Sequence, residues 1–358
     1  MFREISHVDK WFRGILEIGQ QIRLPSSEKK EEYIINSLMN EAIASSQLEG
    51  AATEYKVAKE MLRSGRKPTD KNEQMIVNNW QAIQYIRKNA NEKLSIDMLC
   101  EIQFILTKNT FENPEESGKF RVRDDIVVRY KNEEIYEPPS ATVLPSHMEA
   151  LCAFANFDDE TKWIHPLIKG AMLHFWIGYD HPFTDGNGRT ARAVMYWYLL
   201  SRGYFLFQYL SISKHFLTTP GQYVRAYLYT ETDDNDLTYF LLYNLSSVRA
   251  ALEKLLNYLK QKQEEIVNAD KLLRTFRGLN ARQKKFIYHA LQHPDHPYTI
   301  AGYKITNGIA YDTARKDLAD LEKSKFIKHQ REGKKLLVYY LSEKTIEKLR
   351  KSNPGQKI

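Results

Sequence analysis

A glycine-containing loop between two helical patterns carries the residues best suited to chemistry. Its sequence is His181-Pro182-Phe183-Thr184-Asp185-Gly186-Asn187-Gly188-Arg189. Gly186 and Gly188 allow positive φ angles, so neighbouring N–H groups can point into one concavity. This concavity opens onto the N-terminus of a helix expected to begin near Arg189, where unpaired N–H groups and the helix dipole favour an anion. The loop therefore predicts a phosphate site.

Charged and titratable side chains around this loop indicate the type of reaction. Arg189 and Arg192 lie three residues apart on one helical turn, and their planar forks suit phosphate oxygens. Asp185 beside a phosphate would be repelled unless Mg²⁺ bridged the two. His181 titrates near neutral pH and can remove a proton from an incoming hydroxyl. Together they predict a phosphoryl- or nucleotidyl-transfer site, which Phe183 would anchor to the core.

Other interpretations of these residues stay open. A histidine between helices is often structural, the segment Asp185–Gly188 alone could form an ordinary turn, and arginines at a helix end are often solvated. His174, His181 and Asp185 could instead bind a metal ion. We favour the anion site because glycines and arginines surround it.

Length and composition indicate a protein of two or three domains with a sizeable core. The chain has 358 residues, of which 42% are apolar and 27% are charged, as in soluble globular proteins. It lacks an apolar run of about 18 residues, the length that a membrane span needs. The N-terminal residues Met1–His7 do not form a secretory signal pattern, and the two cysteines, Cys100 and Cys152, lack metal-type spacing. We therefore expect a cytoplasmic protein with no membrane partner.

Apolar periodicity predicts a mainly α fold with two small β elements. The first helical pattern runs from Ser27 to about Arg63. A hairpin is expected within Gly118–Pro139, because two β-rich runs flank a polar turn and prolines end them. After Asn280, three helical patterns precede a strand, a turn and a strand, the order of a winged helix-turn-helix. The predicted domains are an N-terminal helical region (1–95), a catalytic core (96–260), a linker helix (261–279) and this C-terminal module (280–358).

The positive charge is confined to the end of the chain. The net charge is +7, and residues 271–358 alone carry 20 lysines and arginines against 8 acidic residues. Arg315 and Lys316 on the expected recognition helix, and Lys334 and Lys335 at the expected wing tip, are suited to contact phosphates. Aspartates dilute the charge of the recognition helix, so DNA binding and protein docking remain equal alternatives for this module.

The run from His181 to Arg192 resembles the signature of the Fic family at every position. The segment Gly118–Arg121 is similar to the one before the family's flap, and the hairpin that ends at Glu137-Pro138-Pro139 resembles the flap, which holds the target's backbone as an added strand. His165-Pro166-Leu167 and His174 also fit the family's pattern before the loop. The resemblance covers about residues 30–250 and implies a Fic-type helical bundle with a β-hairpin flap.

This resemblance implies a protein adenylyltransferase that uses ATP and Mg²⁺. His181 would deprotonate a Ser, Thr or Tyr hydroxyl of a protein target, which attacks the α-phosphorus of ATP and expels pyrophosphate. Asp185 would hold Mg²⁺, and Asn187 with the adjoining glycines would stabilise charge on the α-phosphate. The target would dock on the flap, and the chain could modify itself. The implied ATP-binding residues are Asp185, Gly186, Asn187, Gly188, Arg189, Thr190, Ala191 and Arg192, with Ile135 and Tyr136 of the flap.

A second resemblance concerns regulation. In Ala44–Gly50, Ser45 is followed four residues later by Glu49 and then Gly50, a pattern that resembles the family's inhibitory helix. Ser45 and Glu49 share one helical face. Glu49 would pair with Arg192 and occupy the place of the γ-phosphate oxygens. The resemblance thus implies an enzyme that is slow at rest, and the same carboxylate could orient water to remove AMP from a target.

Two further functions remain alternatives. The chain could be a transcriptional regulator whose core only senses nucleotide, although sensing does not need the base His181. It could also be a Fic relative that transfers another phosphate-containing group. The second arginine, Arg192, favours AMP, because relatives that invert the nucleotide lack it. Homodimerisation is common in relatives and stays open here.

Overall fold

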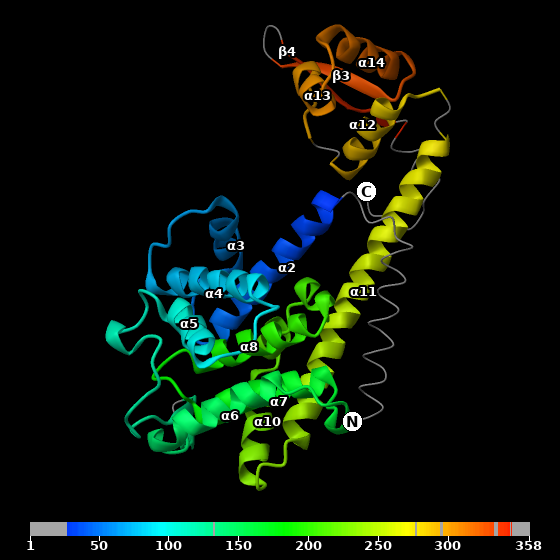
Figure 1. The fold of residues 1–358 in the computed structure, drawn as a ribbon. Helices are drawn as coiled ribbons and strands as arrows, with labels where there is room; N and C mark the ends of the chain where they lie inside the picture. Colours follow the sequence, from blue (N-terminus) through cyan, green and yellow to red (C-terminus); the bar gives the residue numbers. More distant parts are fainter. Residues whose placement is uncertain are drawn as a thin grey trace. The chain divides into compact units, whose positions relative to one another are not determined.

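The computed structural model describes residues 27–345 apart from 132, 276–277, 294–295, 333–335 and 344. The mainly α fold is confirmed (Figure 1), and the chain forms one compact unit that ends at Tyr258 and another that begins at Leu259. The N-terminal residues Met1–His7 and the expected wing tip with Lys334 and Lys335 lie outside the described residues. Within the described residues, no helix has the length and apolar character needed to cross a bilayer.

The first unit packs its helices around α8 (Asn187–Ser201). α7 (Pro166–Asp180) lies beside α8, and α4 (Lys71–Lys88) and α5 (Ile96–Thr107) also contact it. Nearly every residue of α8 is buried, so this helix forms the centre of the core. The other helices of this unit are α2 (Ser27–Leu48), α3 (Tyr55–Ser64), α6 (Leu144–Asn156), α9 (Ser213–Thr218), α10 (Pro220–Thr232) and the start of α11 (Thr238–Thr275), with 3-10 turns at Pro114–Glu116, Ala141–Val143, Glu160–Lys162 and Phe205–Tyr209.

The helical pattern predicted from Ser27 to about Arg63 is divided in the structure. α2 ends at Leu48 and α3 begins at Tyr55. Gly50 causes the break, because its φ of 92° lies in the left-handed region that a helix cannot continue through. The apolar periodicity did not indicate this break, because residues on both sides of it bury side chains against α4.

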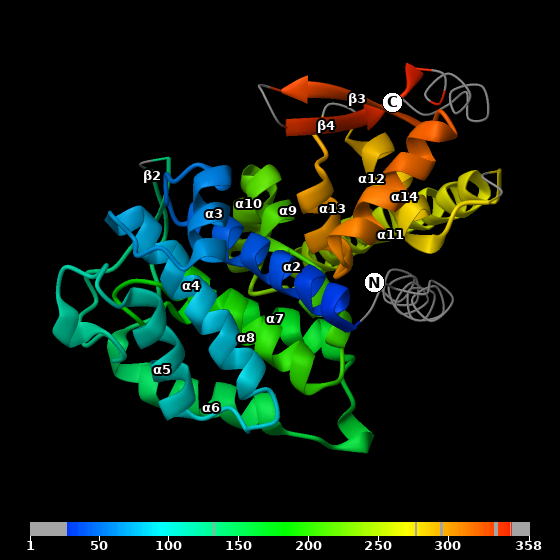
Figure 2. The same ribbon diagram turned by 90° about the horizontal axis from the view of Figure 1, so that it is seen from above.

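Polar contacts attach the middle of α2 to its neighbours, and Figure 2 shows α2 running beside α4. The buried Glu41 carboxylate accepts hydrogen bonds from Ser211 Oγ and from the backbone N of Ser213, both at 3.0 Å, and from Ser213 Oγ. Asn79 of α4 donates to Ser46 Oγ at 3.3 Å. A buried carboxylate is costly unless it is hydrogen-bonded, so these contacts specify where α2 lies.

The predicted hairpin is present but shorter than its β-rich sequence suggested. β1 (Val128–Tyr130) pairs antiparallel with β2 (Glu133–Tyr136), and the register shifts between Val128 and Arg129. Val122, which the sequence grouped with the hairpin, precedes the strands and is 89% exposed. Two paired strands of three and four residues form a small projecting element rather than part of a larger sheet.

The second unit has the predicted order of three helices and a hairpin. The helices are α12 (Ala281–Gln292), α13 (Ile300–Asn307) and α14 (Tyr311–Lys323), followed by the antiparallel strands β3 (Ile327–Glu332) and β4 (Leu336–Leu341). Phe286, Ile287, Leu318 and Leu321 contribute to its own apolar core. Up to Thr275, the predicted linker helix continues α11 rather than starting a separate element.

Candidate active site

The loop between α7 and α8 is shaped by two left-handed residues and one bracing side chain. His181 ends α7 with φ 46° and ψ 56°, and Gly186 precedes α8 with φ 82°. The Asn187 side chain closes the loop, because its Oδ1 accepts from Phe183 N (2.9 Å) and its Nδ2 donates to Phe183 O (2.7 Å). Phe183 is 0% exposed, which confirms its predicted role as apolar anchor.

This geometry opens the first turn of α8 as an anion cradle. α8 begins at Asn187, two residues earlier than expected, and no side chain caps it. The backbone N–H groups of Asn187, Gly188 and Arg189 have no hydrogen-bond acceptor within the part of the chain that the structure describes. Unpaired N–H groups at the positive end of a long helix attract a negatively charged group.

Both arginines of the loop are buried, which argues against their being merely solvated. Arg189 Nη1 donates to Leu106 O at 2.9 Å, and its Nη2 lies 3.2 Å from Asp185 Oδ2. The side chains of Arg189 and Arg192 are 1% and 2% exposed. Two buried guanidinium groups beside the open N–H groups give the cradle a strong positive charge.

Glu49 supplies a negative charge to this cradle from α2. Arg192 Nη2 donates to Glu49 Oε1 at 2.8 Å, and the same guanidinium donates to Ser45 through Nε–Oγ and Nη2–O contacts of 2.9 Å each. A Cβ atom on Gly188 would lie 2.3 Å from Glu49 Oε1, so only glycine leaves room for the carboxylate there. The inhibitory residues and the ATP-binding loop predicted from the sequence therefore meet at one point.

The electrostatics keep Glu49 ionised. Its side chain is 30% exposed, so its burial is partial. This burial raises the pKa of the carboxyl group, but the charges of Arg192 and Arg189 outweigh the effect and hold the pKa below its ordinary value. The adjoining Gly50 ends the helix and exposes no side chain to the cradle. Glu49 thus behaves as an internal anionic ligand.

His181 lies in a state suited to accept a proton. Its Nδ1 is 3.2 Å from the carbonyl oxygen of Gly178, and a carbonyl can only accept, so Nδ1 carries the hydrogen and Nε2 keeps its lone pair. Burial lowers the pKa of the imidazole, while the Gly178 carbonyl and Glu49 partly oppose the shift. His181 is therefore neutral near neutral pH, as a general base must be.

The metal alternative built on His174, His181 and Asp185 is wrong. No group of three His, Cys, Asp or Glu side chains able to hold a metal occurs among the described residues. His174 is 0% exposed and its Nε2 lies 2.8 Å from Tyr223 OH, and burial lowers the pKa of this imidazole to about 3. It is a neutral core residue.

Asp185 fits the role predicted for Mg²⁺ together with a nucleotide. Its side chain is 44% exposed at the edge of the cradle, and its Oδ1 also accepts from Gly186 N at 2.6 Å. Mg²⁺ is commonly bound by one or two carboxylates together with substrate phosphates and water. A single accessible carboxylate beside a phosphate cradle supplies that donor set.

Three of the predicted ATP-binding residues are buried on α8. The Asn187 side chain is held by Phe183 through its Oδ1 and one N–H of its Nδ2, so it keeps a second Nδ2 N–H beside its backbone N–H. Thr190 and Ala191 are both 0% exposed, because their positions on α8 face the core. A contact of either residue with a nucleotide stays a prediction.

The flap residues lie close to the end of α7. Ile135 and Tyr136 are half-buried on β2, and the Tyr136 ring packs against Tyr179 with centroids 5.4 Å apart. Tyr179 is two residues before His181. The flap thus packs against the end of α7, and the predicted contact of Ile135 and Tyr136 with a nucleotide stays a prediction.

Sequence reasoning missed two side chains that hold the loop. Gln103 Nε2 donates to Asp185 O at 2.9 Å, and Arg121 Nε donates to His181 O at 2.9 Å. Gln103 had no visible signal in the sequence, since an amide on an apolar helix looks ordinary. Arg121 stood in the recognised segment before the flap, but its contacts needed the structure.

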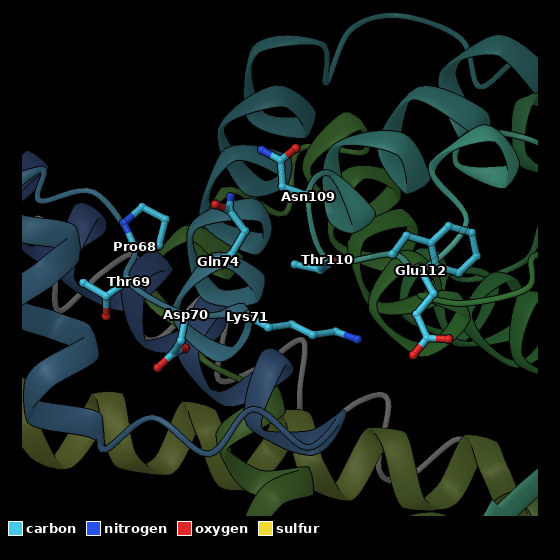
Figure 3. A pocket seen from close by; sticks show the side chains of 9 residues that line it. Pro68, Thr69, Asp70, Lys71, Gln74, Asn109, Thr110 and Glu112 are labelled. Carbon is cyan, nitrogen blue, oxygen red and sulfur yellow. The ribbon is translucent and has the colours of Figure 1, made fainter.

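A separate surface hollow of about 430 Å³ lies between the start of α4 and the end of α5 (Figure 3). Its lining includes Asp70, Lys71, Gln74 and Asn109. None of the residues from His181 to Arg192 lines it. It therefore does not form part of the cradle.

Comparison with known proteins agrees with this geometry. Residues 93–199 match the model of the Fic/DOC family, so this segment is a Fic domain. The protein adenylyltransferase Fic of Nematostella vectensis is 28% identical over 178 residues, which cover 49% of this chain and 39% of that protein. The protein adenylyltransferase fic-1 of Caenorhabditis elegans is 29% identical over 114 residues, which cover 32% of this chain and 21% of that protein. The chain thus matches less than half the length of these curated relatives.

Solved structures show the same fold. A Fic family protein from Desulfovibrio desulfuricans superposes with a TM-score of 0.64 at 16% identity, covering 95% of this chain and 96% of that one. Fic-1 of Caenorhabditis elegans superposes with a TM-score of 0.56 at 20% identity, covering 72% and 74%. The helical bundle with its hairpin is therefore a Fic-type fold.

Proposed function

We propose that this chain is an autoinhibited protein adenylyltransferase, which transfers AMP from ATP to a Ser, Thr or Tyr hydroxyl of a protein and releases pyrophosphate. One observation carries the proposal. A neutral imidazole stands beside a cradle of two buried arginines and three N–H groups that have no acceptor among the described residues. Relatives named protein adenylyltransferase support the same activity.

Each part of the reaction has a residue suited to it. His181 Nε2 takes the proton of the hydroxyl, whose oxygen then bonds to the α-phosphorus while the bond to pyrophosphate breaks. The N–H groups of Gly188 and its neighbours stabilise charge on the α-phosphate oxygens. Arg189 and Arg192 bind the β- and γ-phosphates. Asp185 would hold Mg²⁺, which neutralises phosphate charge when bound.

The resting enzyme is slow because Glu49 competes with ATP. Its carboxylate occupies Arg192 and the space over Gly188, where γ-phosphate oxygens would lie. ATP then binds without one of its clamps and in an unproductive position. The same carboxylate is placed to orient a water molecule, which would permit removal of AMP from a modified target as a reverse reaction.

Intact-mass spectrometry of the purified chain with ATP and Mg²⁺ tests the activity. We expect self-modification by the mass of one AMP group, and faster addition when Glu49 is replaced by glycine. Addition of a phosphate mass instead would establish the alternative Fic reaction. If ATP binds but neither mass appears on the chain or on proteins of a cell lysate, the nucleotide-sensing alternative replaces the enzyme.

The second unit favours an additional role in DNA binding. Asp317, one of the aspartates that dilute the charge of α14, is only 5% exposed and accepts from Arg282 Nε (2.8 Å) and Asn280 Nδ2 (2.8 Å). Its charge is therefore compensated inside the unit. Arg315 and Lys316 are exposed on α14 together with Asp312 and Asp320, so the exposed face of this helix is less acidic than its sequence suggested, with a balanced charge.

A gel shift with the full chain and duplex DNA checks this role. We expect binding that weakens as salt rises, and that weakens further when Arg315 and Lys316 are replaced by alanine. The control is Lys254→Ala, which removes an exposed lysine of the first unit. Binding that is absent, or equal in both variants, would favour protein docking, including a homodimer contact.

A further inference from the structure

Arg121 uses every donor of its guanidinium group to connect the flap with the loop that bears His181. Nε donates to His181 O (2.9 Å), Nη2 to Asp180 O (3.3 Å) and to Pro139 O. Nη1 donates to Arg123 O (2.9 Å) and to Asp124 Oδ1 (3.2 Å). An arginine side chain has five N–H donors, and all of them are used here. The side chain is 2% exposed.

Two of these bonds cap the end of α7. The last carbonyl groups of a helix have no partner within it, and they carry the negative end of the helix dipole. Arg121 satisfies the carbonyls of Asp180 and His181, and its backbone N–H donates to Pro182 O at 2.9 Å. His181 holds a left-handed conformation with φ 46°, which is unfavourable for a residue with a side chain. The cap supplies the contacts that hold it there.

The remaining bonds hold both ends of the flap. Arg123 and Asp124 precede β1, and Pro139 follows β2. The guanidinium group of Arg121 therefore bonds the chain both before and after the hairpin Val128–Tyr136. Asp124 in turn accepts from Ser140 Oγ at 2.9 Å, just beyond the hairpin. One side chain therefore fixes the base of the flap relative to the end of α7.

We propose that Arg121 is a positioning residue that keeps the flap in register with the base His181, so that a hydroxyl on a chain docked at the flap meets the imidazole Nε2. This inference rests on the proposed function, since it assumes that the flap receives the target. Arg121 donates no hydrogen bond to any residue from Asp185 to Arg192. Its effect should therefore fall on the transfer step and leave the binding of ATP unaltered.

Arg121→Lys in the Glu49→Gly background tests the proposal. Lysine keeps the charge but offers one nitrogen, which cannot reach all three segments. We expect the rate of self-modification at saturating ATP to fall about 100-fold, the cost of a small misplacement of reacting groups. The ATP concentration that gives half of this rate should change by less than about two-fold. The control is Arg63→Lys, which changes an exposed arginine of α3 that makes no contact with Arg121 among the described residues.

Nitrogen NMR of protein with labelled histidines measures the pKa and the tautomer of His181 without requiring AMP transfer. The signal of His181 is assigned as the one that His181→Ala loses. Glu49 and Asp185 raise the pKa of His181, and Arg121 lowers it. Removing the positive charge in Arg121→Gln should therefore raise this pKa, whereas Arg121→Lys should leave it nearly unchanged. Both variants should lose the single Nδ1–H tautomer of the parent. If the Glu49→Gly protein shows this tautomer of His181 and yet transfers no AMP, that result would contradict the proposed function, while NMR could still test whether Arg121 positions His181.

Three results would overturn the proposal. The first is a parental transfer rate in Arg121→Lys, and the second is an unchanged tautomer and titration of His181 in both variants. The third is loss of the cooperative melting transition in both variants, because Arg121 would then maintain the fold as a whole rather than the register of flap and base.

Discussion

Replacing Glu49 by glycine should raise the rate of self-modification with ATP by about 10- to 100-fold. The carboxylate accepts a 2.8 Å hydrogen bond from a guanidinium that is 2% exposed, and it lies where a Cβ on Gly188 would be. A charged hydrogen bond contributes about 1.5–3 kcal/mol, which corresponds to about this change in the population of the open cradle. Glycine removes the carboxylate without adding bulk.

The rate is measured as gain of one AMP mass per chain over time. Glu54→Gly is the matched control, because this exposed glutamate precedes α3 and its side chain makes no capping hydrogen bond. It should modify itself at the parental rate. Equal rates for Glu49→Gly and the parent would show that the carboxylate does not restrain the enzyme.

Replacing His181 by alanine in the Glu49→Gly background should lower the rate of transfer by about 1,000-fold. A positioned general base contributes about 100- to 10,000-fold, and the structure leaves His181 Nε2 as an open proton acceptor beside the cradle. ATP should still bind, because the N–H groups and arginines of α8 are unchanged. His215→Ala, outside the loop, serves as the control for the loss of a histidine.

Titration provides a second check on His181. Its pKa lies below the ordinary value because of burial, so transfer should persist through mildly acidic pH and fall only when the imidazole becomes protonated. The negative charge of Glu49 favours the protonated form. Its removal in Glu49→Gly should therefore lower the pKa further and move the acid limb of the rate profile to lower pH. An acid limb that moves upward would contradict this account of His181.

Much of the fold could be predicted from the sequence, because helices, strands and turns are each indicated by residues that are close together in the chain. The hairpin and the order of the second unit came from β-rich runs, turns and apolar spacing. The division of the pattern from Ser27 to Arg63 did not, because side chains on both sides of Gly50 are buried and keep a helical period. A glycine inside an apolar pattern does not by itself show its φ angle.

The site was predictable where one short segment supplies it. His181, Asp185, Gly188 and the two arginines are close in sequence, and the structure places them around one cradle. The use of the Asn187 side chain by Phe183 could not be foreseen, since an amide beside glycines suits a phosphate equally well. Arg121 escaped notice because its partners are spread from Arg123 to His181, and sequence spacing does not report such contacts.

The attachment of α2 limits what must move when the restraint on ATP is lifted. Glu41 and Ser46 hold the helix upstream through buried hydrogen bonds, whereas only its last residues reach the cradle. Glu49 lies just beyond Leu48, the last residue of α2, so a local change at residues 48–50 is enough to withdraw its carboxylate while Glu41 and Ser46 stay in place. Such a local change costs far less free energy than detaching a 22-residue helix. A weak signal acting at Glu49 and Gly50 would thus be enough to free Arg192 from the carboxylate.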